Sequence, residues 1–156
     1  MSILFFDEQH SRFYHDQHQR AKKLGIPRDA YFDALVYLCG LCEETRRSFH
    51  TMFDWKCRGI VPGSLNEGWQ TGTTRKVTRL AFNLWNGFCG DDDTSEEVSP
   101  FCVPDEIFCC HFQPYFFEAI RLRFPEYSGL STQPDPMRLT PAQKNHTADP
   151  STPGQA

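Results

Sequence analysis

The chain has 156 residues, of which 14% are aromatic, and its formal net charge is −4 at pH 7. This length fits one domain built around one hydrophobic core. The mild negative charge excludes a protein whose whole surface is built to hold nucleic acid, so a nucleic-acid function would require a local basic patch.

The first half of the chain predicts three helices. Asp7 is placed to cap a helix that ends at Gly25. A second helix is expected within residues 28–44, and a third from about Thr45 that ends before Gly59. The core residues expected on the second and third helices are Tyr31, Ala34, Leu35, Leu38, Leu41, Cys42, Phe49, Met52 and Phe53.

A short helix is predicted next. Ser64 and Glu67 stand three residues apart, which is the spacing of a capping box. The helix would run through Trp69 and would be interrupted by Gly72.

The most regular pattern follows, and it predicts a helix capped by Thr73 or Thr74. Six apolar residues recur on one face of it: Val77, Leu80, Ala81, Leu84, Trp85 and Phe88. This face is expected to form a stripe of the core.

The last third of the chain begins with an acidic loop, residues 89–100, that we expect to be exposed. Pro104 restricts the start of a short helix, and Pro114 fits the first position of a final helix that Pro125 ends. Residues 128–156 contain too few large apolar side chains to offset the entropy lost on ordering.

The predicted fold is therefore all-α. It consists of a compact single-domain bundle of five or six helices over residues 1–127, followed by a disordered tail over residues 128–156. Trp69 and Trp85 are expected near the core. No apolar run reaches the roughly 20 residues of a membrane-spanning helix, and the apolar N-terminal stretch is too short for a secretory signal. We expect a cytoplasmic protein outside the membrane.

The cysteines are better explained as buried thiols than as a redox or metal centre. The chain has seven, and Cys39 and Cys42 form a C-x-x-C pair within an apolar helical pattern. Core packing is favoured for this pair, with a metal or redox role as the alternative. For Cys109 and Cys110, burial of at least one is favoured over a strained disulfide.

Other metal and catalytic patterns are incomplete. His10, His15 and His18 lie on the first predicted helix, and the spacing of His15 and His18 could present two imidazoles to one ion, but no third ligand is evident. The acidic loop lacks the residue order of a calcium-binding loop, and no nucleophile or phosphate-loop motif occurs. The sequence predicts no metal site, no cofactor and no catalytic residues, and it gives no positive indication of an enzyme.

One polar cluster is the candidate binding site. It surrounds the start of the most regular helix and comprises Trp69, Gln70, Thr71, Thr73, Thr74, Arg75, Lys76 and Arg79. Hydroxyls, backbone N–H groups and three cations at a helix start could hold a phosphate of a nucleic acid or nucleotide. The favoured interpretation is plainer: the cations cover the polar side of a core helix and pair with Glu67 or the acidic loop.

Three stretches resemble a known family: "ETRRSF", "LNEGWQTGTTRKVTRLAFNLWNG" and "DEIFCC…PYFFEAIRLRFPEY". They are similar to small uncharacterised proteins, a domain of unknown function of Firmicutes and their mobile elements. The resemblance spans about residues 7–127 and implies a compact intracellular domain without a defined activity. The tail after Tyr127 looks like an addition to the family pattern.

The leading functional hypothesis is a non-enzymatic interaction or regulatory protein with a protein partner. A mobile-element setting suggests binding and inhibition of a larger host machine, as in anti-defence proteins such as anti-CRISPRs. The alternatives are nucleic-acid or nucleotide-phosphate binding at Thr71–Arg79, and a metal or redox role of Cys39 and Cys42.

Overall fold

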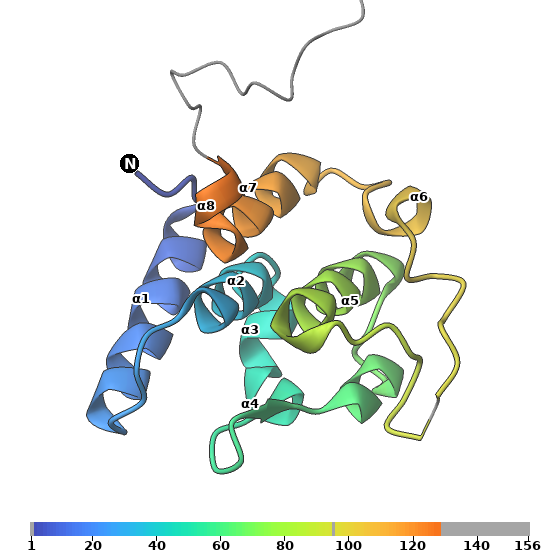
Figure 1. Ribbon diagram of the computed structural model, residues 1–156, viewed down its shortest axis with the longest axis horizontal. Helices are drawn as coiled ribbons and strands as arrows, with labels where there is room; N and C mark the ends of the chain where they lie inside the picture. Colours follow the sequence, from blue (N-terminus) through green and yellow to red (C-terminus); the bar gives the residue numbers. More distant parts are fainter. Residues whose placement is uncertain (1, 95, 129–156) are drawn as a thin grey trace, which may run out of the picture.

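The computed structural model describes residues 2–94 and 96–128, which fold into helices joined by loops and one small hairpin (Figure 1). The α-helices are α1 (Glu8–Lys23), α2 (Ala30–Cys39), α3 (Glu43–Arg47), α4 (Phe49–Met52), α5 (Gly72–Asn86), α6 (Pro104–Ile107), α7 (Gln113–Arg123) and α8 (Pro125–Ser128). The hairpin strands β1 (Phe53–Asp54) and β2 (Gly59–Ile60) pair antiparallel, and the 3-10 helix η1 (Pro62–Asn66) follows them. The predicted all-α class is confirmed. Except for Ser128 in α8, the predicted disordered tail lies outside the described residues.

α2 is the central helix, and it packs against α1, α5 and α7 (Figure 1). Residues 34–39 are all fully buried, so this helix is apolar around its whole circumference rather than along one stripe. The prediction of one helix within residues 28–44 was too long, because α2 ends at Gly40. Tyr31 was wrongly placed in the core: it is 45% exposed, and the Arg123 guanidinium lies 3.6 Å from its ring centre.

The end of α2 lies directly against α1. A Cβ atom on Gly40 would lie 2.6 Å from Cδ2 of His10, so only glycine allows this close approach. The His10 ring is fully buried and its Nε2 donates to the carbonyl of Tyr37 at 2.7 Å, while its Nδ1 accepts from the N–H of Phe6 at 3.1 Å. The predicted cap of α1 is confirmed, because the Asp7 carboxylate accepts from the N–H of His10 at 2.7 Å.

α3 and α4 replace the single helix predicted from about Thr45. The two short helices and the hairpin bring Phe49, Phe53 and Trp55 together with Phe32 of α2. Ring centres of the contacting pairs in this cluster lie 5.4 to 6.3 Å apart, mostly in edge-to-face or tilted pairs, which is the arrangement that aromatic rings favour. This cluster closes the core on the side of the hairpin.

The capping box predicted for Ser64 and Glu67 is wrong. Ser64 lies inside η1, where its hydroxyl donates to the carbonyl of Val61 at 2.7 Å. Glu67 instead accepts from the hydroxyl of Thr51 at 2.9 Å and from the indole N–H of Trp69. Glu67 is thus used by a tertiary contact with α4 and Ser64 by a local contact, and no helix runs through Trp69.

α5 carries the predicted stripe. Val77, Leu80, Ala81 and Leu84 are buried, whereas Trp85 and Phe88 are half-buried and pack on the edge of the core. The buried face is wider than predicted because it also includes Thr78 and Phe82. Gly87 ends the helix with φ = +79°, a left-handed conformation that disfavours any side chain.

The prolines of the last third act as predicted at helix boundaries. Pro104 begins α6, Pro114 lies in the first turn of α7, and Pro125 starts the separate turn α8. The prediction that one of the adjacent cysteines is buried is wrong, because Cys109 is exposed and Cys110 is half-buried beside the core. Among the helices described, none has both the length and the apolar character to span a membrane.

Candidate functional site

The start of α5 caps itself. Thr71 is the N-cap, and its hydroxyl accepts from the N–H of Thr74 while the Thr74 hydroxyl accepts from the N–H of Thr71. The expectation that Thr73 or Thr74 caps the helix is therefore wrong, and Gly72 begins the helix rather than interrupting it. Because the two threonines bond each other, their hydroxyls are already used within the chain.

Arg79 is a structural residue rather than a free cation. It is 8% exposed, and its guanidinium donates to the carbonyl of Gly90, the hydroxyl of Ser99 and the carboxylate of Asp91, at 3.2, 3.2 and 2.8 Å. The Ser99 hydroxyl and then the Arg79 guanidinium hold the pKa of Asp91 below its usual value. The loop expected to be exposed is thus tied to α5 through buried Gly90 and Ser99.

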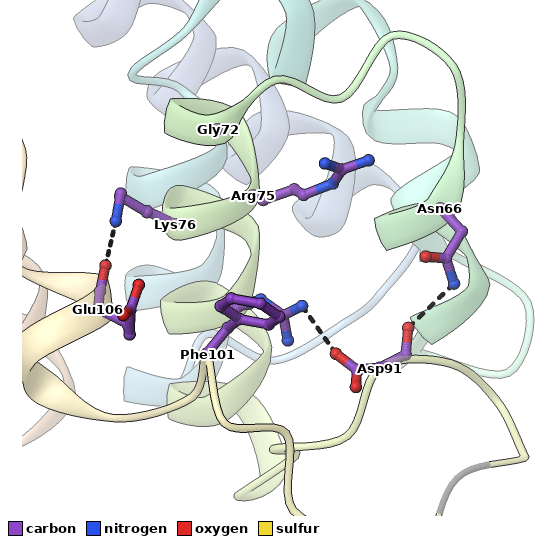
Figure 2. Close-up of a pocket in the computed structure, with 8 residues that line it drawn as sticks. Asn66, Gly72, Arg75, Lys76, Asp91, Phe101 and Glu106 are labelled. Atoms are coloured by element: carbon purple, nitrogen blue, oxygen red, sulfur yellow. Dashed lines mark hydrogen bonds and ion pairs between the residues drawn. The ribbon is translucent and has the colours of Figure 1, made fainter.

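This attachment creates a cleft of about 440 Å³ beside α5, which we call the α5 cleft. Its lining consists of Asn66, Gly72, Arg75, Lys76, Arg79, Asp91, Phe101 and Glu106. Figure 2 shows Arg75 pointing from α5 toward the segment that bears Asn66, while Lys76 points toward Glu106. Phe101 forms a wall of the cleft from the opposite segment.

The two outer cations of the cleft keep donors for a ligand. Arg75 is exposed, and its Nε donates to the carbonyl of Leu65 at 3.3 Å, which leaves its terminal nitrogens without a partner in the described part of the chain. The Lys76 ammonium donates to the backbone carbonyl of Glu106, which is a neutral acceptor. Neither cation is paired with a carboxylate within residues 2–94 and 96–128, whereas Arg79 is.

The structure divides the predicted site residues among three places. Arg75, Lys76 and Arg79 line the α5 cleft, whereas Thr71, Thr73 and Thr74 line a separate hollow between α5, α3 and the segment that precedes α7. Trp69 and Gln70 face neither, because Trp69 donates to Glu67 and buried Gln70 donates to Ser64 and Thr78. The predicted anion-binding cluster is therefore not one surface.

Phe101 is the cleft residue that the sequence pattern did not reveal. It lies in a loop without periodicity and is 54% exposed, with the Arg79 guanidinium 5.5 Å from its ring centre. A large ring beside Pro100 in a polar loop was the available signal. Phe101 could be assigned to the cleft only from the structure, in which Arg79 holds the loop against α5.

The C-x-x-C pair is packed in the core, which is the interpretation that the sequence favoured. Cys39 and Cys42 are both buried free thiols, and the Thr45 hydroxyl donates to both of their carbonyls. Burial raises the pKa of the Cys39 thiol, and it raises the pKa of Cys42 to about 12. Because a thiolate is the reactive and metal-binding form, this environment opposes the redox and metal alternative.

The three histidines of α1 do not converge on one point. His10 is buried against α2, while His18 contacts the Tyr14 carbonyl at 2.7 Å and the Asp33 carboxylate at 2.6 Å. His15 is exposed. Within the described residues, no group of three or more histidine, cysteine or acidic side chains is arranged to hold a metal ion.

Comparison of the sequence with known protein families gives a match. Residues 1–136 match a family of unknown function (DUF6075). The chain belongs to this family. The match extends at both ends beyond residues 7–127, so the family pattern continues past Tyr127, where we expected it to stop. No curated protein and no solved structure matches the chain.

Proposed function

We propose that this family member is a non-enzymatic binding protein that takes an acidic segment of a partner protein into the α5 cleft. The observation that carries the proposal is the exposed ring of Phe101 opposite Arg75 and Lys76 in one hollow. Aromatic and arginine side chains dominate the binding energy of protein interfaces, especially in hollows that a partner can desolvate. The ring would supply apolar contact, and the two cations would supply charge-assisted hydrogen bonds.

The charges around the cleft favour a polypeptide over a nucleic acid. Asp91 and Glu106 line the same hollow, and the adjoining loop continues with Asp92 and Asp93. A nucleic-acid strand carries a charge at every phosphate, so it would meet these carboxylates as well as the cations. A polypeptide can place its carboxylates opposite Arg75 and Lys76 alone, and its apolar residues against the ring.

We further propose that the partner is part of a larger intracellular host machine that this protein regulates or inhibits, as an anti-defence protein would. The support for this step is the resemblance of the sequence motifs to proteins of mobile elements, which is an argument by association.

The test is affinity capture with the purified protein from a lysate of the organism that encodes it, with and without nuclease, followed by titration of the captured partner. Phe101→Ser should weaken binding by about 30-fold or more, as expected for an interface anchor. Phe117→Ser is the matched control, because Phe117 is similarly exposed (56%) but does not line the cleft. Arg75→Glu should also weaken binding, whereas Arg47→Glu on exposed α3 should not.

Other outcomes would replace the proposal. Capture that disappears with nuclease, together with affinity that falls steeply with salt, would identify nucleic acid as the partner. Equal losses for Phe101→Ser and Phe117→Ser would move the interface away from the cleft. Circular dichroism of each variant separates lost binding from lost folding.

A further inference from the structure

A second hollow lies where the end of α1 turns into α2, and we call it the α1 corner pocket. It has a volume of about 520 Å³, within the range of small-molecule sites. Its lining comprises His15, His18, Gln19, Ala21, Lys22, Gly25, Ile26, Pro27, Arg28 and Phe32. In Figure 1 the end of α1 lies at the far left, whereas α6, which contributes Glu106 to the α5 cleft, lies at the far right.

The pocket has an apolar base. Ala21 and Phe32 are buried core residues at its floor, while Ile26 and Pro27 are more exposed and form part of its wall. The turn between α1 and α2 holds this wall in place, because the N–H of Ile26 donates to the carbonyl of Ala21 at 2.9 Å. An apolar body could rest here without displacing a structural hydrogen bond.

The polar rim is cationic. Arg28 is 62% exposed, and Lys22 is exposed on the last turn of α1. The Arg28 Nε donates to both carboxylate oxygens of Asp33, at 3.0 and 3.1 Å, and one Nη donates to the hydroxyl of Tyr14 at 3.2 Å. Its remaining N–H groups, and the Lys22 ammonium, have no partner in residues 2–94 and 96–128.

Among the described residues, no carboxylate lines this pocket, in contrast with the α5 cleft. The acidic group that bonds Arg28 is Asp33, whose side chain is 14% exposed and also bonds His18. Asp33 therefore holds the Arg28 guanidinium in position without offering a free negative charge. A pre-positioned arginine is suited to bind an oxyanion, since less side-chain entropy is lost on binding.

We infer that the α1 corner pocket binds a small organic anion with a flat apolar body. The carboxylate or phosphate group of the ligand meets Arg28 and Lys22, and the apolar body lies along Ile26 and Pro27. This inference is independent of the proposed function, because it uses other residues and another class of ligand.

The test is a titration of the ¹⁵N-labelled protein with 2-naphthoate, followed by amide chemical shifts, with 2-naphthamide as the uncharged probe of equal shape. We expect shifts concentrated in residues 15–32 and an affinity for the amide at least about fivefold weaker. Lys22→Gln should weaken 2-naphthoate binding by about threefold to fivefold, the upper range for an exposed charge pair. Lys23→Gln is the matched control, because Lys23 is the next residue of the helix, is exposed and does not line the pocket.

Three results would overturn the inference. They are the absence of shifts in residues 15–32 up to the solubility of 2-naphthoate, equal affinities for the acid and the amide, and equal effects of Lys22→Gln and Lys23→Gln. Lys22 and Lys23 are exposed surface positions, so neither substitution is expected to unfold the protein. Arg28 is left unchanged, since its contacts with Asp33 and Tyr14 also join the start of α2 to α1.

Discussion

Lowering the pH from 7 to 4 should destabilise the fold through His10. Burial of its ring lowers the pKa of His10 from the usual 6.5 to about 4, an effect that the hydrogen bond with Tyr37 and the charge of Asp7 partly oppose. The hydrogen bonds require the neutral ring: the backbone N–H of Phe6 needs an unprotonated Nδ1, and the Tyr37 carbonyl needs a proton on Nε2. Protonation of Nδ1 would break the first bond and place a charge in the core.

The sign and size follow from proton linkage. Between pH 6.5 and about 4 the unfolded chain binds a proton at His10 and the folded protein does not, so stability decreases as the pH falls through this window. The difference of about 2.5 pH units, at about 1.4 kcal/mol per unit, corresponds to about 3.5 kcal/mol in full, of which about 3 kcal/mol is lost by pH 4. This is a large part of the roughly 5–15 kcal/mol that stabilises a typical domain. The contribution is complete above pH 6.5 and lost near pH 4.

The assay is urea unfolding, followed by circular dichroism, at half-unit steps from pH 7 to pH 4. Carboxylates also titrate at the acidic end, so the quantity to compare is the difference between the native protein and His10→Gln. The variant should be less stable at pH 7, and its deficit should shrink by about 3 kcal/mol as the pH falls. Leu38→Val, a destabilised core variant that keeps His10, should retain the native pH dependence. A deficit for His10→Gln that is the same at pH 7 and pH 4 would refute the reasoning.

Three further predictions concern stability and reactivity. Gly87→Ala should lower the free energy of unfolding by about 1 kcal/mol, because Gly87 has a left-handed φ. Gly72→Ala should not lower it, because the space around the Cβ position of residue 72 is open. Thermal unfolding of the two variants tests this difference. Arg79→Met should lower the free energy of unfolding by about 2 kcal/mol and accelerate amide exchange in residues 89–101, because it removes three hydrogen bonds of a buried cation. Normal protection of that loop in the variant would contradict the anchoring role of Arg79. An aromatic disulfide reagent at pH 8 should modify exposed Cys109 rapidly and Cys42 slowly, since burial raises the pKa of Cys42 to about 12. Mass spectrometry of digested samples assigns each modified site. Rapid labelling of Cys42 would contradict its burial.

The sequence predicted those features of the fold that depend on neighbouring residues. Asp7 caps α1 because its carboxylate reaches an N–H three residues away, and Gly25 follows the end of the same helix because glycine accepts a positive φ. The stripe on α5 was recognisable because the helical period repeats within the segment itself. In each case the partner groups lie within one or two helical turns.

Long-range contacts account for the errors. The apolar pattern of α2 continued past Gly40 because Leu41 and Cys42 are also buried, although Cys42 has an extended backbone and precedes α3. Ser64 and Glu67 had the spacing of a capping box, yet Ser64 lies inside η1 and Glu67 accepts a hydrogen bond from Thr51, which is 16 residues away. Local spacing cannot show which of two available partners a side chain will have.

The candidate site depends both on the local sequence pattern and on tertiary contacts. The sequence by itself determined that Arg75, Lys76 and Arg79 lie together on the polar side of a core helix, since the opposite side is apolar at helical spacing. Only the tertiary structure decided their separate roles, because the loop that returns from Asp91 to Phe101 buries Arg79 and leaves Arg75 and Lys76 facing a hollow. The α1 corner pocket likewise required the fold, since Lys22 and Phe32 lie on different helices and line one hollow only because α1 turns onto α2.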